Sequence, residues 1–339
     1  MSGLPMMPSD SRAAGSSLPR RARGVSLCPM SQLANRSVEF ADGTLAVRDH
    51  GGDGPTVLLV HALGMSAMNW QRVAVRLRES CRVLAMDYPG HGQSTASMRT
   101  PYSVFECVLA VARGLDLPPA LLVGHDHGSL VVAEAVTAAP ELFTGGVAVG
   151  GSIARTREEM QLMCDVASSE FFIESMRTRF RFGARGDGPL EAEALIDDVM
   201  ERAAEDWIMR GLTGLREERA YCIRYLDETR WIHQPDPEDV AMVGRFPSSS
   251  PYFPTMDLAA GYQVPMWMVQ LSHGQDVQLA DREQELAAQH EALRVVPFRS
   301  GQWPQFTRPG ALARLIDLIA QDPTGDPAQW EQSSRSLLA

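Results

Sequence analysis

Asp126 stands at the centre of a glycine-flanked pentapeptide, Gly124-His125-Asp126-His127-Gly128. The apolar run 120–123 precedes it, and a helical pattern over residues 129–139 follows it. A strand that turns sharply into a helix exposes the central side chain, and small flanking residues permit so tight a turn. A carboxylate in this place can attack carbon as a nucleophile or transfer a proton as an acid or base. The structural alternative is a buried carboxylate that caps the following helix, where the helix dipole favours negative charge.

A histidine-containing loop and a glycine-rich turn accompany this pentapeptide. The loop His61-Ala62-Leu63-Gly64 follows the apolar run 57–60, and the turn is Asp87-Tyr88-Pro89-Gly90-His91-Gly92-Gln93-Ser94. The three segments resemble the nucleophile elbow, the His-Gly loop and the Asp-x-x-Gly-x-Gly-x-Ser turn of the α/β-hydrolase superfamily. His91 is interpreted as a packing residue of that turn. Ala62 departs from the usual glycine of the loop.

The resemblance implies roles for several of these residues. It implies that the backbone amides of Leu63 and His127 form an oxyanion hole, and it places His61 at the substrate. An aspartate elbow is typical of epoxide hydrolases and haloalkane dehalogenases, in which the carboxylate forms a covalent ester with carbon. In those families a histidine-activated water then hydrolyses the ester. Asp126 is the residue that matches their nucleophile.

The histidine of the superfamily is replaced in this chain. The segment Ser300-Gly301-Gln302-Trp303-Pro304 matches the place where that histidine stands, but residue 302 is glutamine. A glutamine side chain has no titratable nitrogen and cannot act as a general base near neutral pH. Three explanations stay open: an engineered replacement that traps the ester, a natural enzyme that does not hydrolyse, or a catalytically inactive binding protein. The second is favoured, because His125 and His127 flank Asp126 in the expected pocket wall.

The acid that would orient such a histidine is also displaced. No carboxylate follows the apolar run 146–149, whereas the turn 271–276 ends in Asp276. The resemblance makes Asp276 the candidate, although with Gln302 as its partner the most it could do is anchor the amide. A role as an ordinary surface turn residue is the alternative.

The paired histidines of the elbow carry a narrower resemblance. They are similar to the Ser-His-Ser-His-Gly elbow of the cofactor-free quinaldine and quinolone ring-cleaving dioxygenases. Other segments that resemble this family are Leu195 to Trp207, Ser250-Pro251, Met256-Asp257-Leu258, Gln289-His290 and residues 300–304. The resemblance implies a planar, hydroxylated N-heteroaromatic substrate whose proton is removed without metal or flavin. Asp126 would then remove the proton, with His125 or His127 assisting.

Short apolar runs separated by helical patterns predict a mostly parallel sheet with helices on both faces, the α/β-hydrolase fold. After residue 152 the apolar runs stop and helical periodicity begins, which indicates an inserted helical cap. We expect a core over residues 35–152 and 259–325 and a cap over 153–258. Residues 1–34 are expected to be a disordered extension, in which Met30 is an alternative start, and 326–339 a tail.

The composition excludes several partners. With 31 Lys and Arg against 42 Asp and Glu, the net charge is −11, which argues against nucleic acid and anionic membrane surfaces. No apolar run reaches membrane-spanning length, and the five scattered cysteines predict free thiols in the cytoplasm. The sequence shows no metal-ligand spacing and no phosphate-binding loop, so no cofactor is expected. The possibility of a homodimer stays open.

A small apolar or aromatic molecule is the expected partner. The residues predicted to bind it, with plain core packing as the alternative for each, are His61, Trp70, Trp303, Phe306, Trp207, Phe171, Phe172 and Met176. The favoured hypothesis is a cofactor-independent enzyme with non-hydrolytic acid/base chemistry at Asp126 on a small aromatic or polyketide-like substrate, with a dioxygenase-like reaction on an N-heteroaromatic as one possibility. The alternatives are an Asp-nucleophile hydrolase of the epoxide hydrolase or haloalkane dehalogenase type and a ligand-binding pseudoenzyme.

Overall fold

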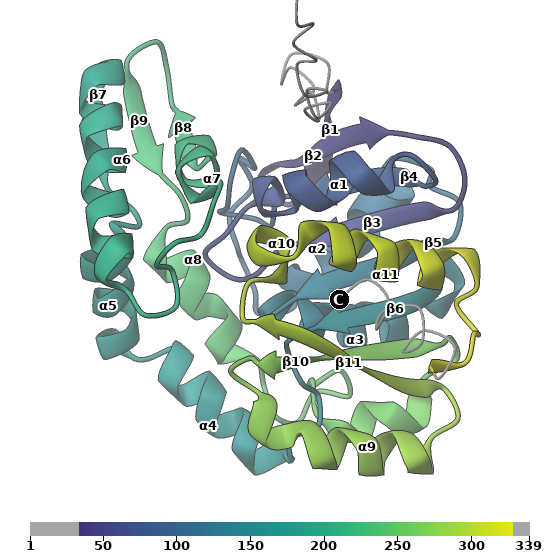
Figure 1. Cartoon of the computed structure of the whole chain (residues 1–339). Coiled ribbons are helices and arrows are strands. Elements are labelled where there is room, and N and C mark those ends of the chain that lie inside the picture. Colours follow the sequence, from purple (N-terminus) through teal and green to yellow (C-terminus); the bar gives the residue numbers. More distant parts are fainter. Residues whose placement is uncertain (1–33, 328–339) are drawn as a thin grey trace, which may run out of the picture. The chain divides into compact units, whose positions relative to one another are not determined.

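An eight-stranded sheet runs through the computed structural model, which describes residues 34–327 (Figure 1). The strand order is β1-β2-β4-β3-β5-β6-β10-β11; β1 and β2 pair antiparallel, β2 pairs antiparallel with β4, and all later pairs are parallel. The strands are β1 Ala34–Phe40, β2 Gly43–Gly51, β3 Thr56–Val60, β4 Arg82–Met86, β5 Ala120–His125, β6 Phe143–Val149, β10 Met266–His273 and β11 Leu293–Gly301. The predicted fold class is confirmed. The predicted extension 1–34 and tail 326–339 lie almost entirely outside the described residues.

Helices cover the sheet on both faces because its central strands are apolar throughout. Every residue of β3 and β5 is buried, as expected of parallel strands that pack on two sides. One core contains side chains of α1 and α11, and the other contains side chains of α2 and α3. These helices are α1 Gln71–Leu77, α2 Ser103–Gly114, α3 His127–Ala138 and α11 Pro309–Gln321. The helical pattern predicted over residues 129–139 corresponds to α3, to within two residues at either end.

The insertion between β6 and β10 contains helices and a second, small sheet. Its helices are α4 Arg157–Ala167, α5 Glu170–Phe180, α6 Gly188–Glu205, α7 Leu215–Tyr221 and α8 Pro237–Met242. Its antiparallel strands, in the order β7-β9-β8, are β7 Arg185–Asp187, β8 Ile223–Tyr225 and β9 Arg230–His233. We had expected only helices here. Three- and four-residue strands with exposed polar residues are too short to leave an alternating pattern in the sequence.

The inserted elements lie where the carboxyl ends of the parallel strands point, as the arrowheads of β10 and β11 show (Figure 1). Ligands of open α/β sheets bind at this edge. The remaining elements are the short helices η2 Ala67–Trp70, η3 Pro140–Leu142, η4 Val243–Arg245, η5 Met256–Gly261, η6 Val277–Leu279 and α10 Pro304–Thr307, and the helix α9 Ala280–Gln289. None of the helices in the described part of the chain is both long and apolar enough to cross a membrane.

Candidate active site

Asp126 occupies a strained turn between β5 and α3. Its φ of 56° and ψ of −120° place a non-glycine residue in a sparsely populated region of backbone conformation. The surrounding glycines make this turn possible. A Cβ on Gly124 would lie 2.0 Å from the carbonyl oxygen of Gly128, and one on Gly151 would lie 2.2 Å from that of Asp126. The turn therefore holds the carboxylate at the carboxyl end of the central strands.

The Asp126 side chain lines a cavity and is otherwise enclosed by protein. Burial raises its pKa from 3.8 to about 6, and the backbone N–H of His127 opposes this rise. A carboxyl group with such a pKa can lose and regain a proton near neutral pH.

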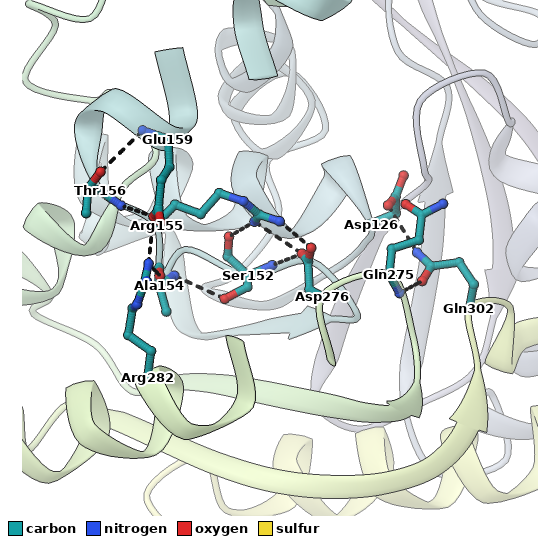
Figure 2. Close-up of polar contacts among 10 residues, drawn as sticks. All are labelled: Asp126, Ser152, Ala154, Arg155, Thr156, Glu159, Gln275, Asp276, Arg282 and Gln302. Atoms are coloured by element: carbon teal, nitrogen blue, oxygen red, sulfur yellow. Dashed lines mark hydrogen bonds and ion pairs between the residues drawn. The ribbon is translucent and has the colours of Figure 1, made fainter. Parts of the chain in front are cut away.

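Gln302 is the side chain that holds this carboxylate. Its Nε2 donates to Oδ1 of Asp126 at 3.1 Å, while its Oε1 accepts from the backbone N–H of Gln275 at 2.8 Å (Figure 2). The N–H of Gln275 can only donate, so the amide oxygen must face it and the NH₂ must face Asp126. Gln302 thus stands where the base was expected and acts as a fixed hydrogen-bond donor.

His125 lies behind Gln302 and does not line the cavity, which corrects its expected place in the pocket wall. Its Nε2 donates to the carbonyl oxygen of Gln302 at 2.7 Å, and its ring packs on Trp303 with centroids 5.0 Å apart. Burial lowers its pKa to about 4, so the ring is neutral near pH 7. Successive side chains of a strand point to opposite faces. His125 accordingly supports the backbone of residue 302.

His127 does line the cavity, on the first turn of α3. Its ring meets Tyr88 edge-on, with centroids 6.4 Å apart. Burial lowers its pKa to about 4, with a smaller contribution from His91 in the same direction. It is therefore a neutral group beside Asp126.

Asp276 binds groups other than Gln302, so the anchoring role that the resemblance allowed for it is excluded. Its carboxylate accepts from the backbone N–H of Ser152 at 2.9 Å and from Nη1 of Arg155 at 3.2 Å, and it forms an ion pair with Arg155 (Figure 2). The neighbouring residue Gln275 supplies the anchor for Gln302 instead. Arg155 comes from the start of the insertion, so the turn that carries Asp276 is tied to the cap.

The loop expected to supply an oxyanion amide is held by an ion pair of α7. Arg219 donates to the carbonyl oxygen of Gly64 at 2.9 Å and pairs with Glu218 at 3.2 Å, and both side chains are almost completely buried. Leu63 lines the cavity, as do Asp126 and His127. The first N–H groups of a helix have no partner within it, and that of His127, at the start of α3, lies at the carboxylate of Asp126. The insertion therefore fixes the loop that faces the carboxylate.

His61 supports this loop from beneath and does not reach the cavity, so its predicted role at the substrate is corrected. Its Nε2 accepts from the backbone N–H of Tyr88 at 3.1 Å, and its Nδ1 donates to the carbonyl oxygen of Ala62 at 2.8 Å. His91 donates from Nδ1 to the carbonyl oxygen of Pro89 and accepts from the N–H of Gly64. Both histidines are fully buried and link the loop to the glycine-rich turn.

The cavity has a volume of about 600 Å³. Of the predicted apolar residues, it is lined by Trp303, Trp207, Phe172 and Met176. Trp70 instead packs in the core beneath α1 and α11, and Phe306 is buried in a cluster behind Trp303. Phe171 is 84% exposed and points away from the cavity. Aromatic residues look alike in a sequence, and only packing decides which of them faces a cavity.

Four charged residues of the lining were not predicted from the sequence, namely Glu134, Arg155, Arg179 and Arg219. Glu134 stands seven residues after His127 on α3, and Leu130 lies between them on the same face. The spacing i, i+3, i+7 places three side chains on one stripe of a helix. This spacing was the signal that could have identified Glu134.

A sequence profile of the alpha/beta hydrolase family matches residues 57–315. The chain belongs to this family. The match includes the elbow, the Leu63 loop, the insertion and Gln302.

The relatives of this alpha/beta hydrolase include several enzymes. It is 26% identical over 126 residues to (E)-2-((N-methylformamido)methylene)succinate hydrolase of Acinetobacter baylyi, covering 37% of this chain and 48% of that protein. It is 31% identical over 127 residues to protein phosphatase methylesterase 1 of Bos taurus, covering 33% of each. The chain thus spans about half of one of these relatives and a third of the other. An uncharacterised protein of Mycobacterium bovis is 28% identical over 305 residues, covering 85% of this chain and 81% of that protein.

Solved structures share the fold of this alpha/beta hydrolase. The structure of E-2-(acetamidomethylene)succinate hydrolase superposes with a TM-score of 0.63 at 17% identity, covering 85% of this chain and 99% of that chain. The enol-lactonase of Burkholderia xenovorans superposes with a TM-score of 0.57, covering 85% and 100%. At such identities the likeness concerns the fold alone, and the chemistry must be derived from the side chains around Asp126.

Proposed function

We propose that this alpha/beta hydrolase family member is a cofactor-independent enzyme that transfers protons through Asp126 without hydrolysis. Its substrate is a small, largely apolar or aromatic molecule, with a hydroxylated N-heteroaromatic ring as the leading class. The observation that supports the proposal most is the hydrogen bond from Nε2 of Gln302 to Asp126, because the orientation of that amide is fixed by Gln275.

The first step follows from this geometry. Gln302 occupies Oδ1, so the other carboxylate oxygen of Asp126 takes a proton from an acidic C–H, N–H or O–H bond of the substrate. The electron pair of that bond stays on the substrate as an anion. We assign the stabilisation of this negative charge to the backbone amides of Leu63 and His127, because both residues line the cavity. A pKa of about 6 leaves Asp126 ionised at pH 7 and able to return the proton.

Covalent hydrolysis is the second candidate. The strained elbow and the hydrolase relatives favour it, because the same turn presents a nucleophile in this family. Its weakness is the second half of the reaction. An ester on Asp126 needs a base to activate water, and position 302 offers an amide that cannot accept a proton near neutral pH. His127 is adjacent, but its lowered pKa makes it a weak base.

Two readouts on the same incubation separate the candidates. The full chain and Asp126→Asn are incubated in D₂O with a panel of hydroxylated N-heteroaromatics, epoxides and haloalkanes. Proton transfer predicts deuterium exchange or conversion of a heteroaromatic by the parent, its loss in Asp126→Asn, and an unchanged protein mass. A mass increase located on Asp126 supports the covalent candidate instead. If parent and variant bind a ligand equally and neither changes it, both enzymatic proposals fail and a pseudoenzyme remains.

A further inference from the structure

Glu134 is a second carboxyl group in the wall of the cavity. It lies on α3, the helix that begins at the Asp126 elbow, and lines the same cavity as His127 and Leu130. Seven residues of helix separate it from His127, which corresponds to about 10 Å along the helix axis. The cavity wall formed by α3 therefore has one carboxyl group near each end, Asp126 beside His127 and Glu134 further along the helix.

No protein group within the described residues satisfies this carboxyl. Glu134 is 3% exposed, and its Oε2 has no hydrogen-bond partner. Apolar side chains dominate the same lining, among them Val104, Met160 and Phe246. Burying a polar group without a hydrogen-bond partner is costly, because the group has given up its hydrogen bonds to water. An unpaired carboxyl in an apolar wall is therefore better explained by a ligand than by packing.

The cations of the cavity are engaged elsewhere. Arg155 pairs with Asp276, Arg219 with Glu218 and Arg179 with Asp206. Burial raises the pKa of Glu134 well above its usual value, and no basic group opposes this rise. Burial without a neighbouring cation favours the neutral carboxylic acid, which offers one O–H donor and one carbonyl acceptor side by side.

We propose that Glu134 is the polar anchor for the end of the substrate that does not react, and that it binds an amide-type edge in which an N–H stands next to a C=O. Such an edge pairs with a neutral carboxylic acid through two parallel hydrogen bonds. An ammonium group fits less well, because it would require an ion pair in an apolar wall. The inference rests on the proposed function in one respect only: it takes Asp126 as the residue that meets the reacting end of the substrate.

A matched pair of probes tests this site without turnover. Naphthalene-2-carboxamide offers the N–H and C=O edge, and its N,N-dimethyl amide lacks the donor. Binding of both is measured by titration calorimetry to the full-length parent, Glu134→Gln and Glu134→Leu. The glutamine side chain keeps one donor and one acceptor, whereas leucine fills the space without either.

The expected result is that the parent prefers the primary amide about tenfold, that Glu134→Gln keeps this preference within about threefold, and that Glu134→Leu loses it. The two probes differ by one buried hydrogen bond, from the N–H of the primary amide, and one such bond accounts for a factor of this size. A parent that does not prefer the primary amide, or a Glu134→Leu variant that still does, overturns the proposal. The same preference must persist in Asp126→Asn, so failure at Glu134 is distinguishable from failure of the chemistry at Asp126.

Discussion

The side-chain amide of Gln302 donates to Asp126 at 3.1 Å, and it can do so in one orientation only. The backbone N–H of Gln275 occupies the amide oxygen at 2.8 Å, which leaves the NH₂ for the carboxylate. A histidine in this place would exchange protons with its neighbours, whereas this amide can only donate. The proton chemistry of the site therefore falls to Asp126.

The activity of the parent should rise with pH along a single limb centred near pH 6. Asp126 must be ionised to accept a proton, and burial sets its pKa at about 6. His125 and His127 have pKa values lowered to about 4, so they are already neutral across this limb and add no second step. The check is a pH–rate profile of kcat/KM from pH 4.5 to 8. A rate that falls as the pH rises through 6 would contradict the role of base.

Replacing Gln302 by leucine should shift this limb to higher pH. The variant loses the donor that stabilises ionised Asp126, so the pKa of the carboxyl rises, by roughly half to one unit for one hydrogen bond. The measurement is again the pH–rate profile of kcat/KM. Gln305→Leu is the matched control, because Gln305 is fully buried, three residues away, and both its side-chain polar atoms lack partners. An unchanged limb in Gln302→Leu would mean that the amide plays no part in proton transfer.

Asp126→Asn should abolish turnover and stabilise the fold near neutral pH. The folded pKa of about 6 lies above the unfolded value of 3.8, so the unfolded chain ionises first as the pH rises. The protonated carboxyl contributes its full stability below about pH 4, and this contribution is lost as the pH rises through about 6. At pH 7 the loss is at most about 3 kcal/mol, and Asp126→Asn avoids it because the asparagine side chain does not ionise.

Urea unfolding at pH 4 and pH 7 measures this difference. Asparagine also tolerates positive φ, so the strained turn is retained. Asp116→Asn is the control, because Asp116 also has a positive φ, 48°, but lies after α2 and does not line the cavity. Equal effects of Asp126→Asn at the two pH values would refute the assigned pKa.

Gly124→Ala should destabilise the protein by about 2–4 kcal/mol and remove activity. The new methyl group would lie 2.0 Å from the carbonyl oxygen of Gly128, so the elbow would have to open. Thermal unfolding compares it with Gly261→Ala, whose Cβ would meet no atom within 4 Å. A loss of stability confined to the control, or equal in both variants, would show that the elbow is not under this steric constraint.

Some features of the site follow from local sequence. These features depend only on residues that are neighbours in the chain. The apolar runs predicted the strands, the glycines around Asp126 predicted the elbow, and the segment 300–304 predicted the place of Gln302. The three short strands of the insertion were missed because their residues carry no alternating pattern. Glu134 was missed because a charged residue within a helix is ordinarily expected at the surface.

The sequence by itself determined the fold, the strained position of Asp126 and the absence of a base at residue 302, because hydrophobic periodicity and steric limits at glycine are local properties. Only the tertiary structure decided that Asp276 pairs with Arg155, that His61 and His125 turn away from the cavity, and that Glu134 faces it. These arrangements depend on side chains from distant segments that compete for the same space and the same hydrogen-bonding atoms. Such competition is settled only when the elements pack.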